Sequence, residues 1–300
     1  MTKRALKPKL LITGGTGVLG GALTEELDCS YDCIPLAKNS TPDNGAMVNL
    51  TDKNESNSIL NKVYPDVIIH AAALTDVDSC EKNLKSAFQL NVQATRYIVD
   101  WILKQNKIIR LVYISTDSVY DDCESGCSEE VVLPGNVYSL TKLWAEDLVS
   151  KVDGSLILRT NFYTAYGKRG IVDWLTKSIN QNITLTLFTD IKFSPLYLNQ
   201  LTNIILKCLS TNIGGVFNVG ASGGGISKSE FIKLVVKYFS LNNVKYTYGQ
   251  SSDANFMIAK RSHNMIMSID KFEKEFKFSL PSIKDGICAM YKDCEKNKEF

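Results

Sequence analysis

Short apolar runs alternate with amphipathic stretches through the first half of the chain. A continuous apolar run bounded by glycine or polar residues is typical of a strand buried in a parallel sheet. Such runs predict strands at residues 9–13, 32–37, 47–50, 67–70, 108–114 and 156–159. Apolar residues at helical spacing predict helices at residues 22–27, 56–63 and 81–105. This alternation predicts an α/β fold with a doubly wound parallel sheet of the Rossmann kind.

Beyond Asn161 the regular alternation ends and helical patterns dominate. They predict helices at residues 196–209 and 231–239, the second preceded by Ser227 and Glu230 in the spacing of a capping box. We therefore expect residues 1–160 to form a dinucleotide-binding Rossmann domain. Residues 161–300 should form mainly a smaller α/β substrate-binding lobe, with the chain crossing back to the first domain.

Composition and charge restrict the classes of partner. Of the 300 residues, 44% are hydrophobic and 22% are charged, and the formal net charge is +2. These values give no reason to expect nucleic acid or an anionic membrane as a partner, and no apolar run reaches the length of a membrane span. Residues 1–8 are basic but lack the apolar middle of a signal peptide. We therefore expect a cytoplasmic protein, and the sequence admits a homodimer.

The cysteines do not have the spacing of a metal site. None forms a Cys-x-x-Cys pair, and only His70 and His263 could join them as zinc ligands, so we expect no metal. The eight are Cys29, Cys33, Cys80, Cys123, Cys127, Cys208, Cys288 and Cys294. We predict that all of them are reduced thiols.

A glycine-rich turn follows the first predicted strand and leads into a helix. Gly14 permits the tight turn, Gly17 lets the backbone approach a pyrophosphate, and Gly20 lets helix and strand pack closely. Free N–H groups at the start of the helix would hold the phosphates. A merely tight strand–helix turn is the alternative, but the strand, turn and helix together favour dinucleotide binding.

The end of the second predicted strand bears on the choice of cofactor. NAD-binding versions of this fold place an acidic residue there to hold the ribose 2′-hydroxyl. This chain has Ala37, followed by Lys38, Asn39 and Ser40. A cation with two small polar groups suits a 2′-phosphate, so we favour NADP(H) and leave NAD(H) open. The alternative is that Lys38 is a solvated surface lysine.

Small side chains follow the strand at residues 67–70. Alanines at the carboxyl end of a strand leave room for a ligand across the edge of the sheet, and Asn49 with Leu50 would lie near the adenine of that ligand. We interpret His70 as a structural histidine whose hydrogen bonds are satisfied. Asn91, inside the predicted helix at residues 81–105, is either a packing residue or one that organises the site.

One further pair of residues, a tyrosine and a lysine, has a spacing that is suited to catalysis. Tyr138 and Lys142 are four residues apart, so on a helix they share one face. The reference pKa values of a phenol and of a lysine are about 10 and 10.4. A neighbouring ammonium favours the phenolate, which brings Tyr138 closer to proton transfer near neutral pH. Thr116 could hold the oxygen whose charge changes during a reaction. Chance pairs of this spacing are common, so the pair depends on its context.

Several motifs together resemble one family. They are Gly14-x-x-Gly17-x-x-Gly20, Pro65–Asp78, Ser115-Thr116-Asp117-Ser118-Val119-Tyr120, Tyr138-x-x-x-Lys142 and Leu158-Arg159-Thr160, with weaker matches at Asp190–Pro195, at residues 211–220 and at Lys260–Phe272. The chain resembles the extended short-chain dehydrogenases/reductases, most of all the dTDP-4-dehydrorhamnose reductase group, over most of its length. The resemblance implies NAD(P)H-dependent reduction of the keto group of a nucleotide-activated deoxysugar, for polysaccharide precursor synthesis.

The resemblance also implies roles for individual residues. Tyr138 would donate the proton, Lys142 would bind the nicotinamide ribose and lower the tyrosine pKa, and Thr116 would hydrogen-bond the substrate oxygen. The expected catalytic residues are thus Thr116, Tyr138 and Lys142, and the expected substrate residues are Thr116, Asp117, Tyr138 and Phe162. The expected cofactor-binding residues are Gly14, Thr16, Gly17, Val18, Leu19, Lys38, Asn39, Ser40, Asn49, Leu50, Ala71, Ala72, Ala73, Tyr138 and Lys142.

Departures from the family pattern leave alternatives open. Asn161-Phe162-Tyr163 replaces the commoner Ser-Trp-Val, and Arg261-Ser262 replaces Arg-Pro, so the sugar pocket differs from that of relatives. A nucleotide-sugar epimerase or dehydratase is one alternative, weakened because Ser118 stands where dehydratases carry a glutamate. A non-catalytic, cofactor-binding regulatory subunit is the other. The intact set of Thr116, Tyr138 and Lys142 favours an enzyme.

Overall fold

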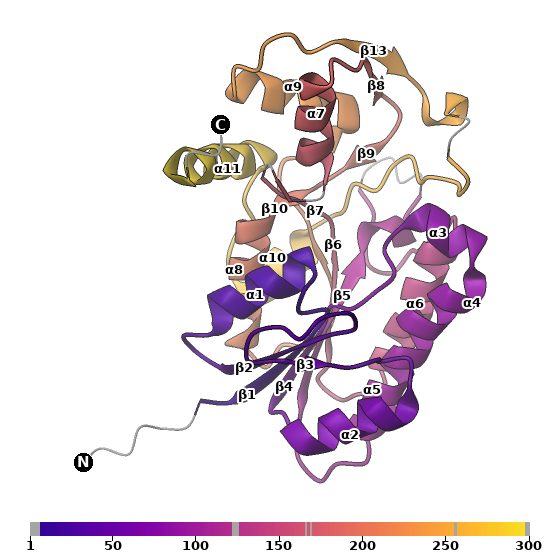
Figure 1. Ribbon diagram of the computed structural model, residues 1–300, viewed down its shortest axis with the longest axis vertical. Coiled ribbons are helices and arrows are strands. Elements are labelled where there is room, and N and C mark those ends of the chain that lie inside the picture. Colours follow the sequence, from indigo (N-terminus) through magenta and orange to yellow (C-terminus); the bar gives the residue numbers. More distant parts are fainter. Residues whose placement is uncertain (1–6, 122–125, 166, 169, 255–256, 298–300) are drawn as a thin grey trace. The chain divides into compact units, whose positions relative to one another are not determined.

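The computed structural model describes residues 7–121, 126–165, 167–168, 170–254 and 257–297 (Figure 1). The chain divides into two compact units. The first comprises Met1–Ser115, Leu140–Leu158 and Thr202–Val216, and the second comprises Thr116–Ser139, Arg159–Leu201 and Phe217–Phe300. The expectation that the N-terminus carries no signal peptide falls largely on residues outside the described ranges, and the domain boundary at residue 160 stays a prediction.

A seven-stranded sheet forms the centre of the first unit. Its order is β11-β6-β5-β4-β1-β2-β3, and the pairs β1–β2, β1–β4, β2–β3 and β4–β5 are parallel. The strands are β1 (Lys9–Thr13), β2 (Asp32–Ala37), β3 (Ala46–Met47), β4 (Val67–His70), β5 (Arg110–Thr116), β6 (Leu156–Thr160) and β11 (Gly215–Val219). The order runs outward in one direction from β1 and in the other from β4. The switch point, where ligands bind in such sheets, therefore lies at the carboxyl ends of β1 and β4.

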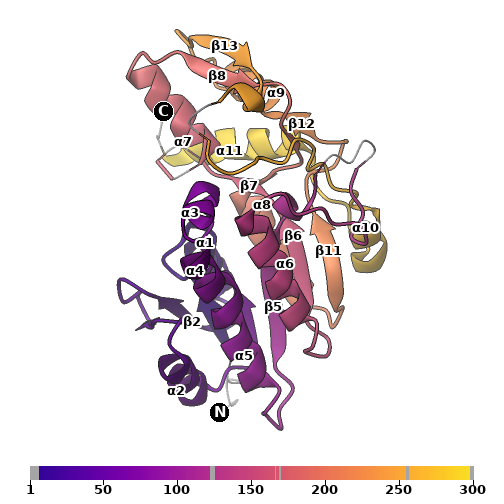
Figure 2. The ribbon, with the colours of Figure 1, turned by 90° about the vertical axis from the view of Figure 1, so that its right-hand side faces the viewer.

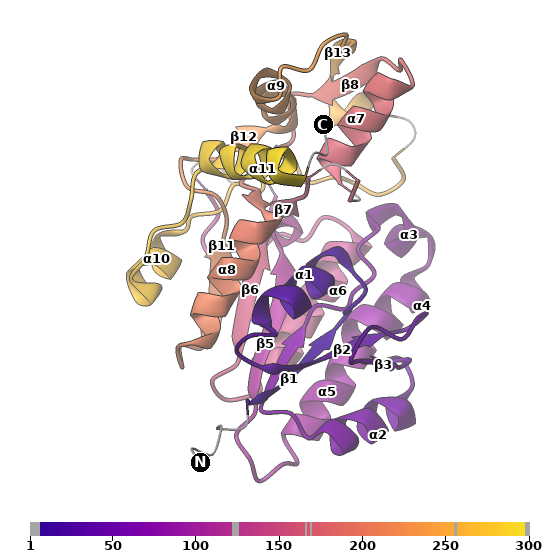
Figure 3. The ribbon, with the colours of Figure 1, turned by 60° about the vertical axis from the view of Figure 1, so that its left-hand side comes forward.

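Helices cover both faces of this sheet, as the doubly wound prediction requires. On one face lie α2 (Lys53–Val63), α5 (Ala94–Ile102) and α6 (Val137–Val149) (Figure 2). Their apolar side chains pack with those of the strands in one core cluster that includes Ile98, Leu111 and Val149. On the other face lie α1 (Val18–Leu27) and α8 (Leu198–Leu209) (Figure 3). Within the described ranges, no helix is long and apolar enough to span a membrane.

The long helix expected at residues 81–105 is wrong as a single element. The segment divides into α3 (Val77–Lys82), α4 (Leu84–Ala87), a π-helical turn (Phe88–Gln93) and α5. Asn83 leaves the helical conformation at φ −139°, and its side chain accepts a hydrogen bond from the N–H of Ser86 at 3.0 Å, which starts a new helix. The apolar stripe continues from the π-helical turn into α5, with Val92, Thr95 and Val99 buried. Helical periodicity therefore did not reveal the π-helical turn.

Two predicted strands have different ends. The strand expected at residues 108–114 begins at Arg110 and continues to Thr116, because the side chain of Ile108 is 95% exposed and has no core to enter. The strand expected at residues 47–50 is only β3, since Val48 and Leu50 turn into the core cluster. The longer β5 carries Ser115 and Thr116 as its last residues.

The second unit is built from short strand pairs and helices. β7 (Phe162–Tyr163) pairs in parallel with β10 (Leu196–Tyr197), and β8 (Leu185–Phe188) with β13 (Tyr246–Gly249); β9 (Lys192–Phe193) pairs antiparallel with β12 (Ile226–Ser227). The helices are α7 (Ile171–Asn180), α9 (Lys228–Tyr238), α10 (Asp270–Phe276) and α11 (Ile283–Asn297), with 3₁₀ turns at Asp117–Val119 and Ser251–Asp253. The predicted capping box is confirmed, because Ser227 and Glu230 exchange both hydrogen bonds at the start of α9.

The prediction that all cysteines are reduced is wrong for Cys127, which is disulfide-bonded. Its backbone N–H donates to the carbonyl of Ile266 at 2.7 Å, and the residue is only 2% exposed. The prediction for Cys123 falls outside the described residues. Six further cysteines are free thiols, namely Cys29, Cys33, Cys80, Cys208, Cys288 and Cys294.

We predict that Gly20→Ala destabilises the protein and that Gly21→Ala does not. A Cβ atom on Gly20 would lie 2.1 Å from the carbonyl oxygen of Gly14, whereas one on Gly21 would lie 3.6 Å from that of Gly15. The first change should lower the free energy of unfolding by about 1–3 kcal/mol, and the second should raise it by up to about 1 kcal/mol. Urea unfolding measures both. Equal stability of the two variants would contradict the close packing of α1 on the turn.

Candidate active site

The glycine turn between β1 and α1 has the geometry of a phosphate cradle. Gly14 has φ +75°, a left-handed conformation that disfavours other residues. Gly17 is the N-cap of α1 and makes no side-chain capping bond, and no acidic residue lies in the first turn. The N–H groups at the start of this ten-residue helix are thus available to an anion, and the positive end of the helix dipole favours one. The residues present fit the pyrophosphate of a dinucleotide.

Thr13 ties the end of β1 to the turn that follows β4. Its Oγ1 accepts hydrogen bonds from the N–H groups of Ala71 and Ala72 at 3.1 and 3.0 Å, so its own proton goes to His70 Nδ1 at 2.7 Å. That proton placement makes His70 Nε2 the donor to Thr95 Oγ1, at 2.9 Å. Burial lowers the pKa of His70 to about 3, so the imidazole is neutral. His70 has the structural role that the sequence predicted.

Asn91 joins the alanine turn to α6. Its Oδ1 accepts a hydrogen bond from the N–H of Leu74 at 2.7 Å, and its Nδ2 donates to the carbonyl of Leu74 at 3.2 Å and to Thr141 Oγ1 at 3.0 Å. The residue lies in the π-helical turn, a deviation often found at functional sites. Of the two interpretations left open by the sequence, the structure supports the one in which Asn91 organises the site.

Lys142 is a buried cation on α6. Its side chain is 2% exposed, its Nζ donates to the carbonyl of Ile114 at 2.7 Å, and the same atom lies 4.1 Å from the centre of the Tyr113 ring. Burial lowers the pKa of Lys142 to about 7, and the carboxylate of Glu146 opposes that shift. Ser115 Oγ donates to Glu146 Oε1 at 2.5 Å. The lysine therefore titrates near neutral pH, where a proton-transfer site operates.

In the second unit, the residues that follow β5 form a buried acidic centre. Asp117 is 1% exposed, and Asn161 Nδ2 donates to its Oδ2 at 2.6 Å. Thr116 Oγ1 accepts from the N–H of Ser118 at 3.1 Å and lies 3.3 Å from Asp117 Oδ1. Burial raises the pKa of Asp117 to about 6, and the bond from Asn161 and the charge of Lys228 oppose the rise. The carboxyl group can gain or lose a proton near neutral pH.

Tyr138 stands in the first turn of α6. Asn136 precedes that helix, and its Oδ1 accepts a hydrogen bond from the N–H of Ser139 at 2.9 Å, as an N-cap does. Tyr138 is 9% exposed. Because α6 runs without interruption from Val137 to Val149, the phenol of Tyr138 and the ammonium of Lys142 project from successive turns of one helix.

The remaining expected residues lie in different surroundings. Thr16, Lys38, Asn39 and Ser40 are exposed, whereas Val18, Ala71, Ala72, Ala73 and Phe162 are half-buried. Leu19 is buried, so only its backbone can face a phosphate. Asn49 Oδ1 accepts from Thr51 Oγ1 at 2.8 Å, and Leu50 belongs to the core cluster. The contacts within the first unit thus bring together the glycine turn, the alanine turn and the Lys142 segment.

Two further residues, one in each unit, escaped sequence reasoning. Glu146 could have been found, since it repeats the four-residue spacing of Tyr138 and Lys142 along α6. Lys228 gave no such signal. Its charge acts on Asp117, more than a hundred positions earlier, and only the fold of the second unit makes them neighbours.

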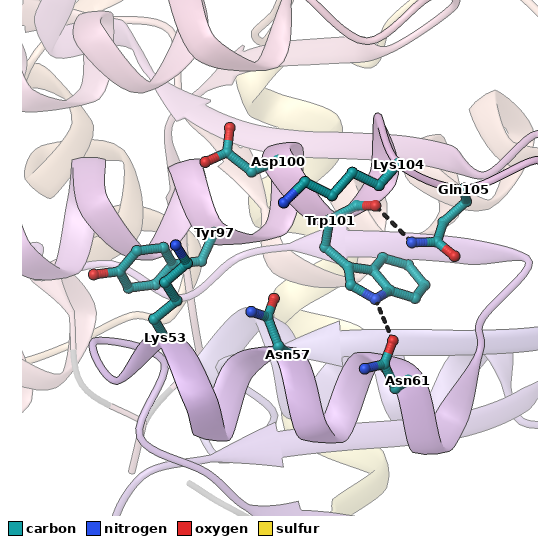
Figure 4. A pocket seen from close by; sticks show the side chains of 8 residues that line it. All are labelled: Lys53, Asn57, Asn61, Tyr97, Asp100, Trp101, Lys104 and Gln105. Atoms are coloured by element: carbon teal, nitrogen blue, oxygen red, sulfur yellow. Dashed lines mark hydrogen bonds between the residues drawn. The ribbon is translucent and has the colours of Figure 1, made fainter.

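Two hollows, one in each unit, lie among the residues that the structure describes. One, of about 240 Å³, lies between α2 and α5 and is lined by Trp101, whose Nε1 donates to Asn61 Oδ1 at 2.7 Å (Figure 4). The other, of about 300 Å³, lies in the second unit and is lined by Lys260, Arg261 and His263. Over the described ranges, no three histidine, cysteine or acidic side chains gather in a way that could hold a metal ion.

A glycine turn at the switch point of a 3-2-1-4 sheet, together with a buried Tyr-x-x-x-Lys helix, defines a Rossmann-fold protein of the short-chain dehydrogenase/reductase class. The comparison with known families is more specific. The chain belongs to the family described as the RmlD substrate binding domain, whose model matches residues 8–296. The resemblance inferred from the sequence motifs is thereby confirmed.

Individual relatives are reductases by name. The probable low-salt glycan biosynthesis reductase Agl14 of Haloferax volcanii is 26% identical, over 93% of this chain and 96% of its own. A dTDP-4-dehydrorhamnose reductase of Aggregatibacter actinomycetemcomitans is 30% identical, over 69% of each chain. The crystal structure of dTDP-4-dehydrorhamnose reductase from Bacillus anthracis in complex with NADP is similar with a TM-score of 0.87 and 27% identity, covering 96% of this chain and 100% of that one. The predicted fold class is confirmed.

We predict that Asn161→Ala raises the pKa of Asp117 above 6 by about one pH unit, because the variant loses a hydrogen bond to the ionised form. The carboxyl group already binds a proton more tightly when folded than its ordinary pKa of 3.8 allows. Stability therefore falls as pH rises from 3.8 to about 6, and in the variant this fall should continue to higher pH.

Carbon NMR of the aspartate carboxyl groups measures the pKa, and urea unfolding between pH 4 and 8 measures the linkage. Ser118→Ala is the control, since its hydroxyl lies 3.4 Å from Asp117 and is the last of the contributions to the pKa. Identical titration of Asp117 in the wild type and in Asn161→Ala would contradict the prediction.

Proposed function

We propose that this protein is an NADPH-dependent reductase of the keto group of a nucleotide-activated deoxysugar, of the dTDP-4-dehydrorhamnose kind, in the synthesis of polysaccharide precursors. The observation that carries the proposal is the single helix α6, which bears Tyr138 and the buried Lys142 in a member of this family. The reductase names of its relatives support the reaction type.

The cofactor proposal rests on the first unit. Backbone N–H groups around Gly17 would hold the pyrophosphate, and Lys38 with Asn39 and Ser40 would hold a 2′-phosphate. No carboxylate stands at Ala37 to accept a hydrogen bond from a 2′-hydroxyl. The NADP complex of the similar Bacillus anthracis enzyme agrees with this preference.

In the proposed reaction, bound NADPH supplies the hydride. Tyr138 donates its proton to the substrate oxygen as that oxygen becomes negative. The Lys142 ammonium, held by the carbonyl of Ile114, favours the tyrosinate that results. The hydroxyl of Thr116 hydrogen-bonds the same substrate oxygen, and its position is fixed by the N–H of Ser118.

The substrate half of the proposal rests on the second unit. Asp117, held by Asn161, and the half-buried Phe162 would contact the sugar. Arg261 lines the 300 Å³ hollow and would supply a cation for the diphosphate that links sugar and nucleotide. Residues 1–160 would thus mainly bind the dinucleotide and residues 161–300 the substrate, in a cytoplasmic protein that forms a homodimer.

We expect the wild type to oxidise NADPH in the presence of one or more nucleotide 4-keto-6-deoxysugars, and Tyr138→Phe to lower kcat by about 10²- to 10⁴-fold. The loss of nicotinamide absorbance measures turnover with dTDP- and UDP-linked sugars. Tyr97→Phe, a change in the hollow between α2 and α5, is the matched control and should keep full activity. Cofactor binding without oxidation with any sugar would overturn the reductase and favour an epimerase or a regulatory subunit.

We expect Lys38→Ala to weaken NADPH binding by about 10- to 100-fold and to leave NADH binding unchanged. A hydrogen bond to a charged group contributes about 1.5–3 kcal/mol, and only NADPH carries the 2′-phosphate. Titration of nicotinamide fluorescence gives both dissociation constants. Lys53→Ala, a surface lysine of α2 that lines the other hollow, is the control. An equal loss for the two cofactors would contradict the assignment of Lys38.

A further inference from the structure

Glu146 is a buried acidic residue that the proposed reaction does not yet use. It stands one helical turn after Lys142 on α6, and its side chain is 3% exposed. Lysine before glutamate is the weaker order for an exposed helix pair, so helix propensity alone gives little reason for this arrangement. A buried ammonium and a buried carboxylate are each costly alone and are tolerated as partners.

Lys142 and Glu146 together hold α6 against two consecutive residues of β5. Lys142 Nζ donates to the carbonyl of Ile114 at 2.7 Å, and Glu146 Oε1 accepts from the hydroxyl of Ser115 at 2.5 Å. The next residue of the strand is Thr116, an expected catalytic residue. These two hydrogen bonds, which join Lys142 to Ile114 and Glu146 to Ser115, therefore fix both the ammonium and the end of β5.

Among the residues that the structure describes, the groups other than Glu146 named here around Lys142 supply no negative charge at neutral pH. From β4, the imidazole of His70 is neutral because of its burial. From β5, the ring of Tyr113 offers its π face at 4.1 Å. On α6 itself, Tyr138 precedes Lys142 by one turn, and Glu146 is the carboxylate whose charge acts on it.

We propose that Glu146 is a positioning residue of the active site, whose carboxylate keeps Lys142 in the ammonium form at the end of β5. This inference rests on the proposed function only for its effect on turnover. In solution, the charge of Glu146 should raise the pH at which Lys142 loses its proton. A clamp without an electrostatic role would need only the hydrogen bond to Ser115.

The Glu146→Gln variant separates these two roles, because the amide oxygen can still accept from Ser115 while the charge is gone. We expect the midpoint of the Lys142 titration to fall by about one pH unit from its wild-type value near 7. NMR of lysines labelled at Cε follows the titration, and the Lys142→Met spectrum assigns the signal. Ser115→Ala removes the hydrogen bond but keeps the charge, so its midpoint should move by much less.

Asp147→Asn is the matched control, since Asp147 is the neighbouring acid on α6 but its side chain is 77% exposed. Its Lys142 midpoint should equal that of the wild type. An unchanged midpoint in Glu146→Gln overturns the inference. If that variant does not fold, Glu146→Asp withdraws the carboxylate by one methylene and must move the midpoint in the same direction by a smaller amount. No movement there also overturns it.

Turnover links the inference to the proposed reaction. Because Lys142 is needed as an ammonium, activity is lost as pH rises through its pKa, and Glu146→Gln should move this alkaline limb of kcat/KM to lower pH by the same amount. If the NMR midpoint moves but no sugar is reduced, the proposed function fails and the inference stands. If turnover is normal and neither the midpoint nor the limb moves, the inference alone fails.

Discussion

The buried ammonium of Lys142 is the interaction centre on which the arrangement of the neighbouring residues depends. An ammonium removed from water needs an acceptor, a polarisable surface or an opposite charge close by. Lys142 has all three, in the carbonyl of Ile114, the ring of Tyr113 and the carboxylate of Glu146. These partners come from the end of β5 and from α6 itself. The register of that helix on that strand is therefore fixed by a charge as well as by apolar packing.

A series of hydrogen bonds between neutral groups connects the surroundings of Lys142 to the cofactor side of the first unit. It runs from Thr141, beside Lys142, through Asn91 and Thr95 to His70 and Thr13. Each member has a donor matched to an acceptor, and full satisfaction is the condition under which a buried polar network adds rigidity. The π-helical turn carries Asn91, whose amide group bonds both Leu74 and Thr141.

Sequence patterns predicted those features that depend on local rules. The bounds of β1, β2 and β4 were correct because a short, mainly apolar run marks each strand, and in β1 that run ends at Gly14. The break at Asn83 was missed because the apolar stripe of Val92, Thr95 and Val99 lies after it and does not report on it. The spacing of Tyr138 and Lys142 identified the helix that bears them. The coupling of Lys228 to Asp117 depends on which distant segments meet, and no local pattern encodes that.

Burial shifts the pKa values of Asp117 and Lys142 in opposite directions for the same physical reason. Burial favours the neutral form of any ionisable group, so it raises the pKa of Asp117 to about 6 and lowers that of Lys142 to about 7. In each case a neighbour limits the shift: Asn161 donates a hydrogen bond to the aspartate, and Glu146 places a negative charge near the lysine. Without these neighbours, burial would favour the neutral form of each group more strongly. In the role that we propose, the carboxylate of Glu146 lets Lys142 be buried and still carry its charge.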